Sequence, residues 1–511
     1  MPSRTLPAPT GGWNVKDALS DLRENEAPRL DNWFPDYGRV SVRPGYSAFV
    51  TSGMGTEKVE TLFEFNADGS RYFGACTDGG IFEITSGTPV SLRAAGTYNS
   101  DRWHWAGMEN SAGSPRLGMV SEGADAPQIV TDGGAAMSIA DMTISGSGLT
   151  PSDLSGINVF KSRSYFWTGL DQDFWYSATN ALGGTLTRFP LGRVNNTGGD
   201  LVAMSSWSVD GGDGKDDLAV FFLSSGDVLV YAGDDPGSSW SLQGVYNMGP
   251  LIDKRGLMKL RGDVIAVTKD GYLPISKNLP LARVAAQSIS ENINPEVVER
   301  ARFGADFAGW QMVHYPRRNM VIVNVPLTSG VAPSPAQYQQ HVFNTQTAAA
   351  CRFTGIPSAC WSLFRDDLYF GGLDGKVYKF DGALSDDGAG IIADAETAWS
   401  YMRSPSTRKL FTAARPNFIA NGNLVGHSLA MGVDFQAANA VAVPASGVGV
   451  GTAWGADWGS PWSGDSKSQF AAWRSVKGSG FAGSMRLRVS NSSQYIDWLA
   501  TNVLYETGGD I

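Results

Sequence analysis

Residues 360–380 decide the predicted fold, and they read CWSLFRDDLYFGGLDGKVYKF. Three short runs of alternating apolar and polar residues are separated by Arg-Asp-Asp and by Leu-Asp-Gly, and Asp-Gly is a favoured turn between two hairpin strands. The glycine pair Gly371–Gly372 leaves space for a neighbouring backbone to approach closely. This pattern is typical of the central and outer strands of one β-propeller blade.

Weaker copies of the same pattern recur along the chain. They are spaced by roughly 40–60 residues, which is the period of propeller blades. The copies start near Leu62, Trp103, Ile157, Leu218, Leu257, Trp310 and Trp361. The sequence therefore predicts an all-β fold, with a β-propeller of six or seven blades over residues 56–386. Residues 1–55 are predicted to form an N-terminal arm, and residues 387–511 a smaller C-terminal β module that contains a Trp/Gly-rich tract.

The composition fits a folded protein without disulfides. Hydrophobic residues make up 42% of the 511 residues and charged residues 18%, which excludes a disordered chain. The 62 glycines indicate many tight turns. Three cysteines are too few for a disulfide framework and favour a reducing compartment. The first residues lack the apolar core of a signal peptide, and no apolar run is long enough to span a membrane. We expect the protein to fold in a cytoplasm.

The charge balance bears on nucleic acid as a partner. With 50 acidic and 40 basic residues the formal net charge is -10, whereas proteins that grip nucleic acid need clustered Lys and Arg. A surface along which nucleic acid slides stays compatible with this charge. The acidic loop at residues 210–217 is the clearest charged feature. It is either a solvated turn or a site for a hard cation such as Ca²⁺, although its spacing does not fit the EF-hand pattern. Its carboxylates are Asp210, Asp213, Asp216 and Asp217.

One motif resembles a catalytic element. Residues 426–430 read GHSLA and resemble the nucleophile elbow of α/β-hydrolases, which requires a following helix and a catalytic His later in the chain. All four histidines precede Ser428: His104, His314, His341 and His427. No Cys lies at zinc-ligand spacing from a His. We therefore predict a protein that is not an enzyme and has no cofactor and no metal site.

Two groups of aromatic residues are candidate contact surfaces. The arm has no evident core of its own, so its large aromatic side chains are expected to be exposed and to anchor it on a partner. These residues are Trp13, Trp33 and Phe34. A second group recurs at intervals of four in the C-terminal tract, and it either fills the core of the module or binds sugars or a partner. These residues are Trp454, Trp458 and Trp462.

Several segments together carry a family resemblance. In the arm these are residues 11–20 (GGWNVKDALS), 30–35 (LDNWFP) and 42–46 (VRPGY). Later in the chain they are residues 318–326 (RNMVIVNVP), 342–347 (VFNTQT) and 368–375 (LYFGGLDG). Each segment is short, but together they are spread over most of the chain. The sequence resembles the tail nozzle, or tail-accessory, structural proteins of short-tailed bacteriophages.

The resemblance implies a function, a location and partners. It implies a structural virion protein that forms a homohexameric ring below the portal and adaptor proteins, through which DNA is ejected without specific binding. Tail fibre or needle proteins would be further partners, and the protein would reside in the virion tail after assembly in the host cytoplasm. The family supplies no catalytic residues. The matching arm residues would serve docking: Gly11, Gly12, Asp31, Asn32, Trp33, Pro44 and Gly45.

The charge of the proposed ring predicts where the acidic loop lies. If six copies form a ring, a basic lumen would hold DNA by its phosphates, so we expect the acidic loop at 210–217 to face the channel or its mouth. The alternative function is a virion or surface propeller that binds or cleaves host-surface glycans. The tryptophans of the C-terminal tract and the many acidic loops motivate that alternative.

Overall fold

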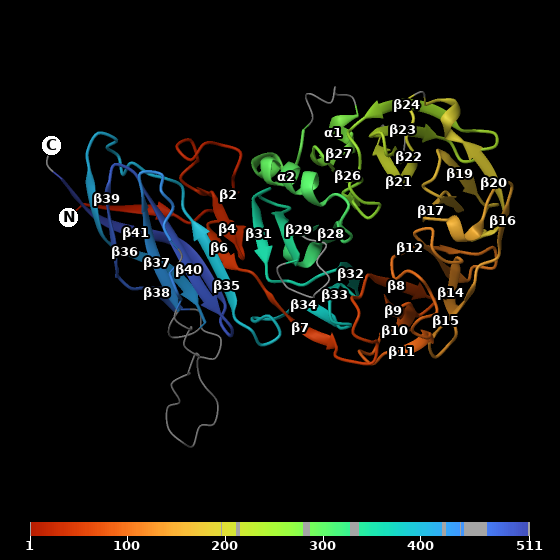
Figure 1. Cartoon of the computed structure of the whole chain (residues 1–511), viewed down its shortest axis with the longest axis horizontal. Helices are drawn as coiled ribbons and strands as arrows, with labels where there is room; N and C mark the ends of the chain where they lie inside the picture. Colours follow the sequence, from red (N-terminus) through yellow and green to blue (C-terminus); the bar gives the residue numbers. More distant parts are fainter. Residues whose placement is uncertain are drawn as a thin grey trace, which may run out of the picture.

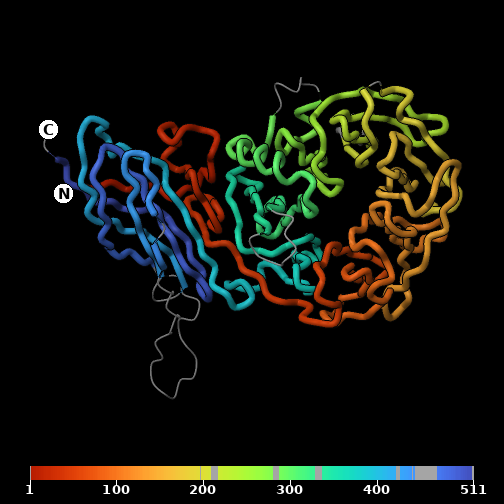
Figure 2. Tube along the Cα trace, in the orientation of Figure 1, coloured from red at the N-terminus to blue at the C-terminus, as the bar shows by residue number. Residues whose placement is uncertain are grey.

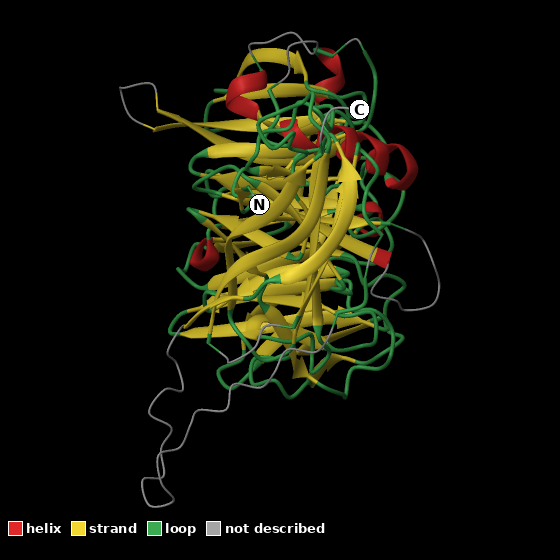
Figure 3. Cartoon of the chain, turned by 90° about the vertical axis from the view of Figure 1, so that its left-hand side faces the viewer, coloured by secondary structure: helices red, strands yellow, loops and turns green. Residues whose placement is uncertain are grey.

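The protein is a ring of β-sheets with a two-sheet module at one side (Figures 1 and 2). The computed structural model describes residues 2–195, 197–210, 215–279, 287–327, 337–421, 426–439, 441–443 and 468–508. Strands account for 54% of the structure and helices for 6%, and the side view is dominated by strands (Figure 3). The predicted all-β class and the propeller are confirmed.

The first four sheets of the ring follow one another along the chain. The first contains β8 (Thr61–Ala67), β9 (Ser70–Thr77), β10 (Gly80–Glu83) and β11 (Val90–Arg93). The second contains β12 (Trp103–Glu109), β13 (Pro115–Ser121), β14 (Gln128–Asp132) and β15 (Met137–Asp141). The third contains β16 (Ile144–Gly146), β17 (Gly156–Phe160), β18 (Arg163–Trp167), β19 (Asp173–Tyr176) and β20 (Gly184–Pro190). The fourth contains β21 (Leu201–Asp210), β22 (Lys215–Leu223), β23 (Asp227–Ala232) and β24 (Ser241–Asn247).

Three further sheets close the ring. A three-stranded sheet contains β25 (Leu257–Leu260), β26 (Asp263–Thr268) and β27 (Gly271–Pro274). The next blade contains β28 (Gln311–Tyr315), β29 (Met320–Pro326), β30 (Tyr338–Asn344) and β31 (Ala350–Thr354). The last contains β32 (Cys360–Phe364), β33 (Asp367–Gly371), β34 (Val377–Ala383) and β7 (Gly45–Val50). The propeller thus has six blades of at least four strands. The three-stranded sheet lies between the blade that starts with β21 and the blade that starts with β28.

The predicted blade starts agree with the structure except at one blade. Each inner strand contacts the next blade around the ring, and β32 contacts β8 to complete the circle. The copy expected at Leu218 lies in β22, because the first strand of that blade, β21, begins at Leu201. The described residues also form two α-helices, α1 (Ile275–Asn278) and α2 (Asn294–Gly304). Among the described residues no helix has the length and apolar character needed to cross a membrane.

The ring is closed by a strand from the N-terminal segment. Strand β7 pairs antiparallel with β34, so the first and last parts of the propeller share one blade. A Cβ atom on Gly45 would lie 2.0 Å from the carbonyl oxygen of Ser385, so only glycine fits here. The boundary predicted at residue 55 therefore falls after a strand that belongs to the propeller.

The C-terminal module is a sandwich of two sheets to which the arm contributes strands. One sheet contains β1 (Ser3–Pro7), β5 (Trp33–Asp36), β6 (Arg39–Val42), β36 (Lys409–Ala420), β38 (Ser468–Ala471), β39 (Arg474–Gly480) and β41 (Ile496–Thr507). The other contains β4 (Arg29–Asp31), β35 (Ile391–Glu396), β37 (His427–Val433) and β40 (Gly483–Asn491). In the core between them, the rings of Trp33 and Trp498 lie 5.7 Å apart and both are fully buried. The arm is therefore part of the module.

One sheet runs without a break from the propeller into the module. Its order is β28-β29-β30-β31-β4-β35-β40-β37. Strand β4 of the arm pairs parallel with β31 of the propeller and antiparallel with β35 of the module. A remaining pair of arm strands, β2 (Gly12–Trp13) and β3 (Glu26–Ala27), packs beside this connection. The sheet joins the two parts of the molecule through backbone hydrogen bonds as well as side chains.

Candidate docking junction of the arm

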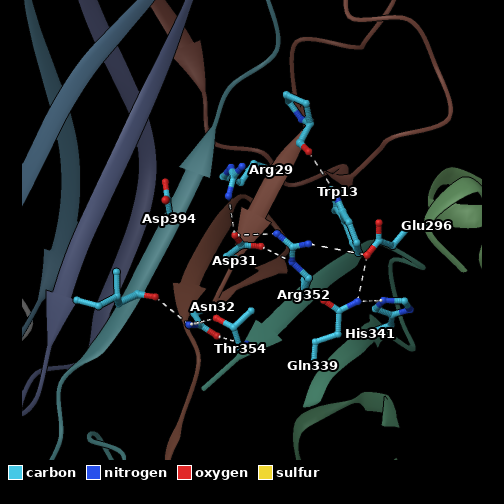
Figure 4. Close-up of polar contacts among 12 residues, drawn as sticks. Trp13, Arg29, Asp31, Asn32, Glu296, Gln339, His341, Arg352, Thr354 and Asp394 are labelled. Carbon is cyan, nitrogen blue, oxygen red and sulfur yellow. Dashed lines mark hydrogen bonds and ion pairs between the residues drawn. The ribbon is translucent and has the colours of Figure 1, made fainter. Parts of the chain in front are cut away.

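An ion pair between the arm and the propeller lies at the centre of the junction. Asp31 is opposite Arg352 in the ladder between β4 and β31. The Arg352 guanidinium donates from Nε to Oδ1 of Asp31 at 2.7 Å and from Nη2 to Oδ2 at 3.0 Å (Figure 4). Arg29 adds a contact at 3.3 Å. Such two-point pairs fix orientation as well as distance.

Arg352 also connects the ion pair to Trp13. The guanidinium carbon lies 5.1 Å from the centre of the Trp13 ring, which is the geometry of a cation–π contact. The Trp13 indole N–H donates to the carbonyl of Pro28 at 3.2 Å. Burial alone would lower the pKa of Arg352, but the hydrogen bond and charge of Asp31 outweigh burial and raise it. Arg352 therefore stays charged inside the junction.

Asn32 holds the turn that follows β4. Its φ of 59° lies in the left-handed region, which Asn tolerates better than most residues. Its amide donates to the Thr354 hydroxyl at 3.0 Å and to the Ile392 carbonyl at 2.8 Å, so it contacts the propeller and the module at once (Figure 4). Its side-chain oxygen accepts from the Arg43 guanidinium at 2.8 Å. Asn32 thus joins three parts of the chain.

Arg43, which donates to the side chain of Asn32, connects the same turn to other parts of the chain. Only 1% of the residue is exposed, and its guanidinium donates to both carboxylate oxygens of Asp386 at 2.8 and 2.6 Å. It also donates to the carbonyl of Thr354 at 2.9 Å. A charge that is buried this deeply requires such a set of partners. Arg43 therefore connects the arm to the segment between the propeller and the module.

His341 lies on the propeller side of the junction and is fully buried. Its Nδ1 lies 2.8 Å from the Tyr272 hydroxyl, and its Nε2 lies 3.0 Å from the Gln339 amide nitrogen, which also donates to Glu296. A neutral imidazole has one donor and one acceptor nitrogen, and both have a partner here. Burial is the main cause that lowers the pKa of His341 to about 3, against the opposing charge of Glu296. The ring is neutral and structural.

The expectation that the arm aromatics are exposed is wrong. Trp13 is 3% exposed, Trp33 0% and Phe34 8%. Trp33 and Phe34 are buried because β5 is a strand of one module sheet. Trp13 lies in β2, outside the two sheets, and is buried because it packs against Arg352 and His341 of the propeller. The predicted contact residues Trp454, Trp458 and Trp462 lie outside the described residues.

The predicted acidic loop is described only at its base. Asp210 ends β21 and Asp216 lies near the start of β22, while Asp213 and the side chains of Asp210 and Asp216 lie outside the described part. Asp217 accepts a hydrogen bond from the Ser208 hydroxyl across the hairpin. The position of this loop in an assembled channel stays a prediction.

The resemblance to a nucleophile elbow does not extend to the structure. Ser428 is the second residue of β37, and its hydroxyl donates to the carbonyl of Val441 at 3.2 Å. An elbow places the serine at a sharp turn between a strand and a helix. His104, another candidate, hydrogen-bonds to Glu122 at 3.1 Å. Within the described ranges, no three His, Cys, Asp or Glu side chains gather as a metal site would require.

A charged segment crosses the centre of the propeller. Arg255, just before β25, donates to the carbonyl of Glu60 at 2.6 Å, directly before β8, and to that of Trp103 at 3.1 Å, at the start of β12. Both strands belong to blades on the other side of the ring. Beside it, Arg102 donates to both carboxylate oxygens of Asp253 at 3.2 and 3.0 Å. Burial lowers the pKa of Arg255. These contacts link opposite blades through the axis.

Sequence reasoning missed the partners of the arm motif. Arg43 and Arg352 are charged residues within otherwise apolar or β-forming stretches, and such residues are buried only when they are paired. That signal marks them as members of a buried network, but their carboxylate partners lie 343 and 321 residues away along the chain.

Comparisons with known proteins identify no family for this chain. No protein-family profile matches the chain, and no curated protein sequence matches it. Among solved structures, the chain is similar to the extracellular domain of a protein from B. thetaiotaomicron, with 13% identity and a TM-score of 0.42 over 78% of this chain. The match covers 50% of the chain of that extracellular domain. It is also similar to BBS1N in complex with ARL6DN, with 9% identity and a TM-score of 0.39 over 65% of this chain and 97% of that one.

Proposed function

We propose that this chain is a structural protein of the tail of a short-tailed bacteriophage, where copies form a ring-shaped nozzle for DNA ejection. The observation that carries the proposal is that the segments that resemble this family meet in space. The Asn344 amide donates to the Pro35 carbonyl at 3.0 Å, which joins segments 342–347 and 30–35. The rings of Tyr46 and Phe370 lie 5.0 Å apart, which joins segments 42–46 and 368–375.

The position of the first arm segment adds support. A Cβ on Gly12 would lie 2.7 Å from the backbone nitrogen and oxygen of Ala350, so the GGW sequence is adapted to contact with the propeller. The resemblance thus concerns one connected region rather than scattered matches. We infer that this region sets the angle between propeller and module, and that a fixed angle lets identical copies close into a ring.

The centre of the propeller has a consequence for the path of DNA. Arg255 and Arg102 connect opposite blades across the axis, so this axis is occupied by protein. In the proposed nozzle, DNA therefore does not pass through the centre of a propeller. It passes between the copies, along the symmetry axis of the assembled ring. The propellers would form the wall of that channel.

The charge distribution is compatible with such a wall. Residues 56–386 contain 35 acidic and 25 basic residues, so the propeller carries the whole formal net charge of -10. The arm and the module are each balanced, with 6 of each sign in residues 1–55 and 9 of each sign in residues 387–511. A wall with net negative charge repels DNA phosphates and lets the duplex slide.

The catalytic candidates support a role without chemistry. Ser428 lies within a strand and donates to a backbone carbonyl, and His341 is fully buried and hydrogen-bonded on both nitrogens. Neither has the accessible nucleophile–base geometry that acyl transfer requires. We propose that the protein is not an enzyme.

Electron microscopy of the purified full-length protein tests the proposal. We expect closed rings with sixfold symmetry and a lumen in which Asp and Glu outnumber Lys and Arg. A monodisperse monomer that binds lipopolysaccharide would contradict the nozzle and favour the glycan-binding alternative. Rings with a lumen dominated by Lys and Arg would also contradict it, since such a ring would clamp DNA.

A further inference from the structure

A cavity of about 400 Å³ lies beside the arm, between the three-stranded sheet and the blade β28–β31. Its floor is apolar and consists of side chains that are at most 5% exposed. These are Ile265, Ile293, Val321, Phe343 and Ala350. Small-molecule sites are typically concave and mostly apolar, with a few polar groups that fix orientation, and they start at about 300 Å³. The size and the lining of this cavity fall within that class.

Two cations lie at the edge of this floor. Arg261 and Lys277 line the cavity, both are exposed, and neither has a hydrogen bond or ion pair within the described part of the chain. The acidic residue on the same lining, Glu291, is already paired with Lys16 of the arm. The cavity therefore combines an apolar floor with two positive charges that no carboxylate of the described chain neutralises.

The backbone holds Arg261 in an unusual conformation. Arg261 and Gly262 form the tight turn between β25 and β26, with φ angles of 52° and 85°. Turns of this kind favour Asn, Asp or Gly at both positions, and an Arg in the left-handed region costs free energy. The chain thus places a long cationic side chain where a small residue would stabilise the turn.

We propose that this cavity binds a small amphipathic anion, namely an aliphatic chain that ends in a carboxylate. The aliphatic body would lie on the floor formed by Ile265, Val321 and Phe343, where it removes apolar surface from water. The carboxylate would lie between Arg261 and Lys277, because charge-assisted hydrogen bonds are strongest where both partners are ionised. The proposal does not depend on the nozzle function, since every group it uses belongs to one copy.

Calorimetric titration of the full-length protein with decanoate tests the proposal. We expect one saturable site per chain. Decanol, which has the same chain length and no charge, should bind at least tenfold more weakly. Equal affinity for decanoate and decanol, or no saturable binding of decanoate, would overturn the proposal.

Three variants locate the site. Arg261→Asn keeps a residue that tolerates the turn, and it should weaken decanoate binding about tenfold, as should Lys277→Gln. Ile289→Trp places a large side chain at the lining and should abolish binding. Lys269→Gln removes an exposed cation from the next turn of the same sheet and serves as the control. Unchanged affinity in Arg261→Asn, or an equal loss in Lys269→Gln, would reject the site. Ring formation measured on the same samples should not change, which separates this test from that of the nozzle.

Discussion

Asp31 and Arg352 lie 321 positions apart in the sequence and form a two-point ion pair at 2.7 and 3.0 Å. One residue belongs to the arm and the other to the outer strand of a propeller blade. The pair marks the place where a single sheet passes from the propeller to the module, so the two parts are coupled through it. A substitution at this pair should therefore change the stability of both the propeller and the module.

Asp31→Asn should lower the free energy of unfolding by about 3 kcal/mol, because it removes the two-point partner of a buried charge and leaves Arg352 only the more distant Glu296, at 4.0 Å. Urea denaturation of the full chain measures this. Arg317→Gln is the matched control, since Arg317 is 64% exposed in its pair with Asp367, and exposed pairs contribute less than about 1 kcal/mol. Equal losses of unfolding free energy in the two variants would show that the Asp31 pair stabilises the fold no more than an exposed ion pair does.

Gly45→Ala should weaken the pairing of β7 with β34, which closes the propeller. The added Cβ would meet the Ser385 carbonyl at 2.0 Å, so β7 has to shift away from its place. We expect a loss of about 1–3 kcal/mol, and faster amide hydrogen exchange in β7 and β34. Gly107→Ala is the control, because the nearest atom to a Cβ there is 3.6 Å away. Unchanged exchange in β34 would contradict the role given to Gly45.

His341 predicts a loss of stability in acid. Its folded pKa of about 3 lies below the ordinary value of 6.5, so the unfolded chain takes up a proton that the folded chain refuses. The contribution is complete above pH 6.5 and is lost as the pH falls from 6.5 toward 3. Between pH 6.5 and 4.5 the protonation of this group alone should lower the free energy of unfolding by about 2–3 kcal/mol. Urea denaturation across this range should show a flatter profile for His341→Gln than for the parent. Parallel profiles would exclude His341 as the cause.

Deletion of residues 1–30 should damage the module more than the propeller. It removes β1, β2, β3 and most of β4, which pair with β41, β31 and β35, but it keeps the closing strand β7. Limited proteolysis should digest the module and leave a protected propeller fragment. Arg4→Ser, which removes only the surface pair with Glu24, should behave like the parent. A protease-resistant module after the deletion would show that the arm is dispensable for it.

The propeller could be predicted because its signals are local. Alternation of apolar and polar residues and turns such as Asp374-Gly375 are read within a few positions, and they locate the starts of six of the seven sheets around the propeller. The inner strand β21 was missed because its polar and small residues give a weak pattern. The burial of Trp33 could not be read in the same way, since its partner Trp498 lies in a strand at the other end of the chain. Local patterns do not reveal which distant strands pair.

The pairing of β1 with β41 has a consequence for synthesis. Thr5 hydrogen-bonds to Asn502, 497 positions later, so at 5–20 residues per second the first strand waits roughly 25–100 s for its partner to leave the ribosome. During that time its edge and the apolar face of the arm have no native cover, and such long-range pairing is slow and prone to aggregation. The yield of soluble protein in a cell should therefore be governed by how well chaperones protect the nascent arm, more than by the stability of the finished fold.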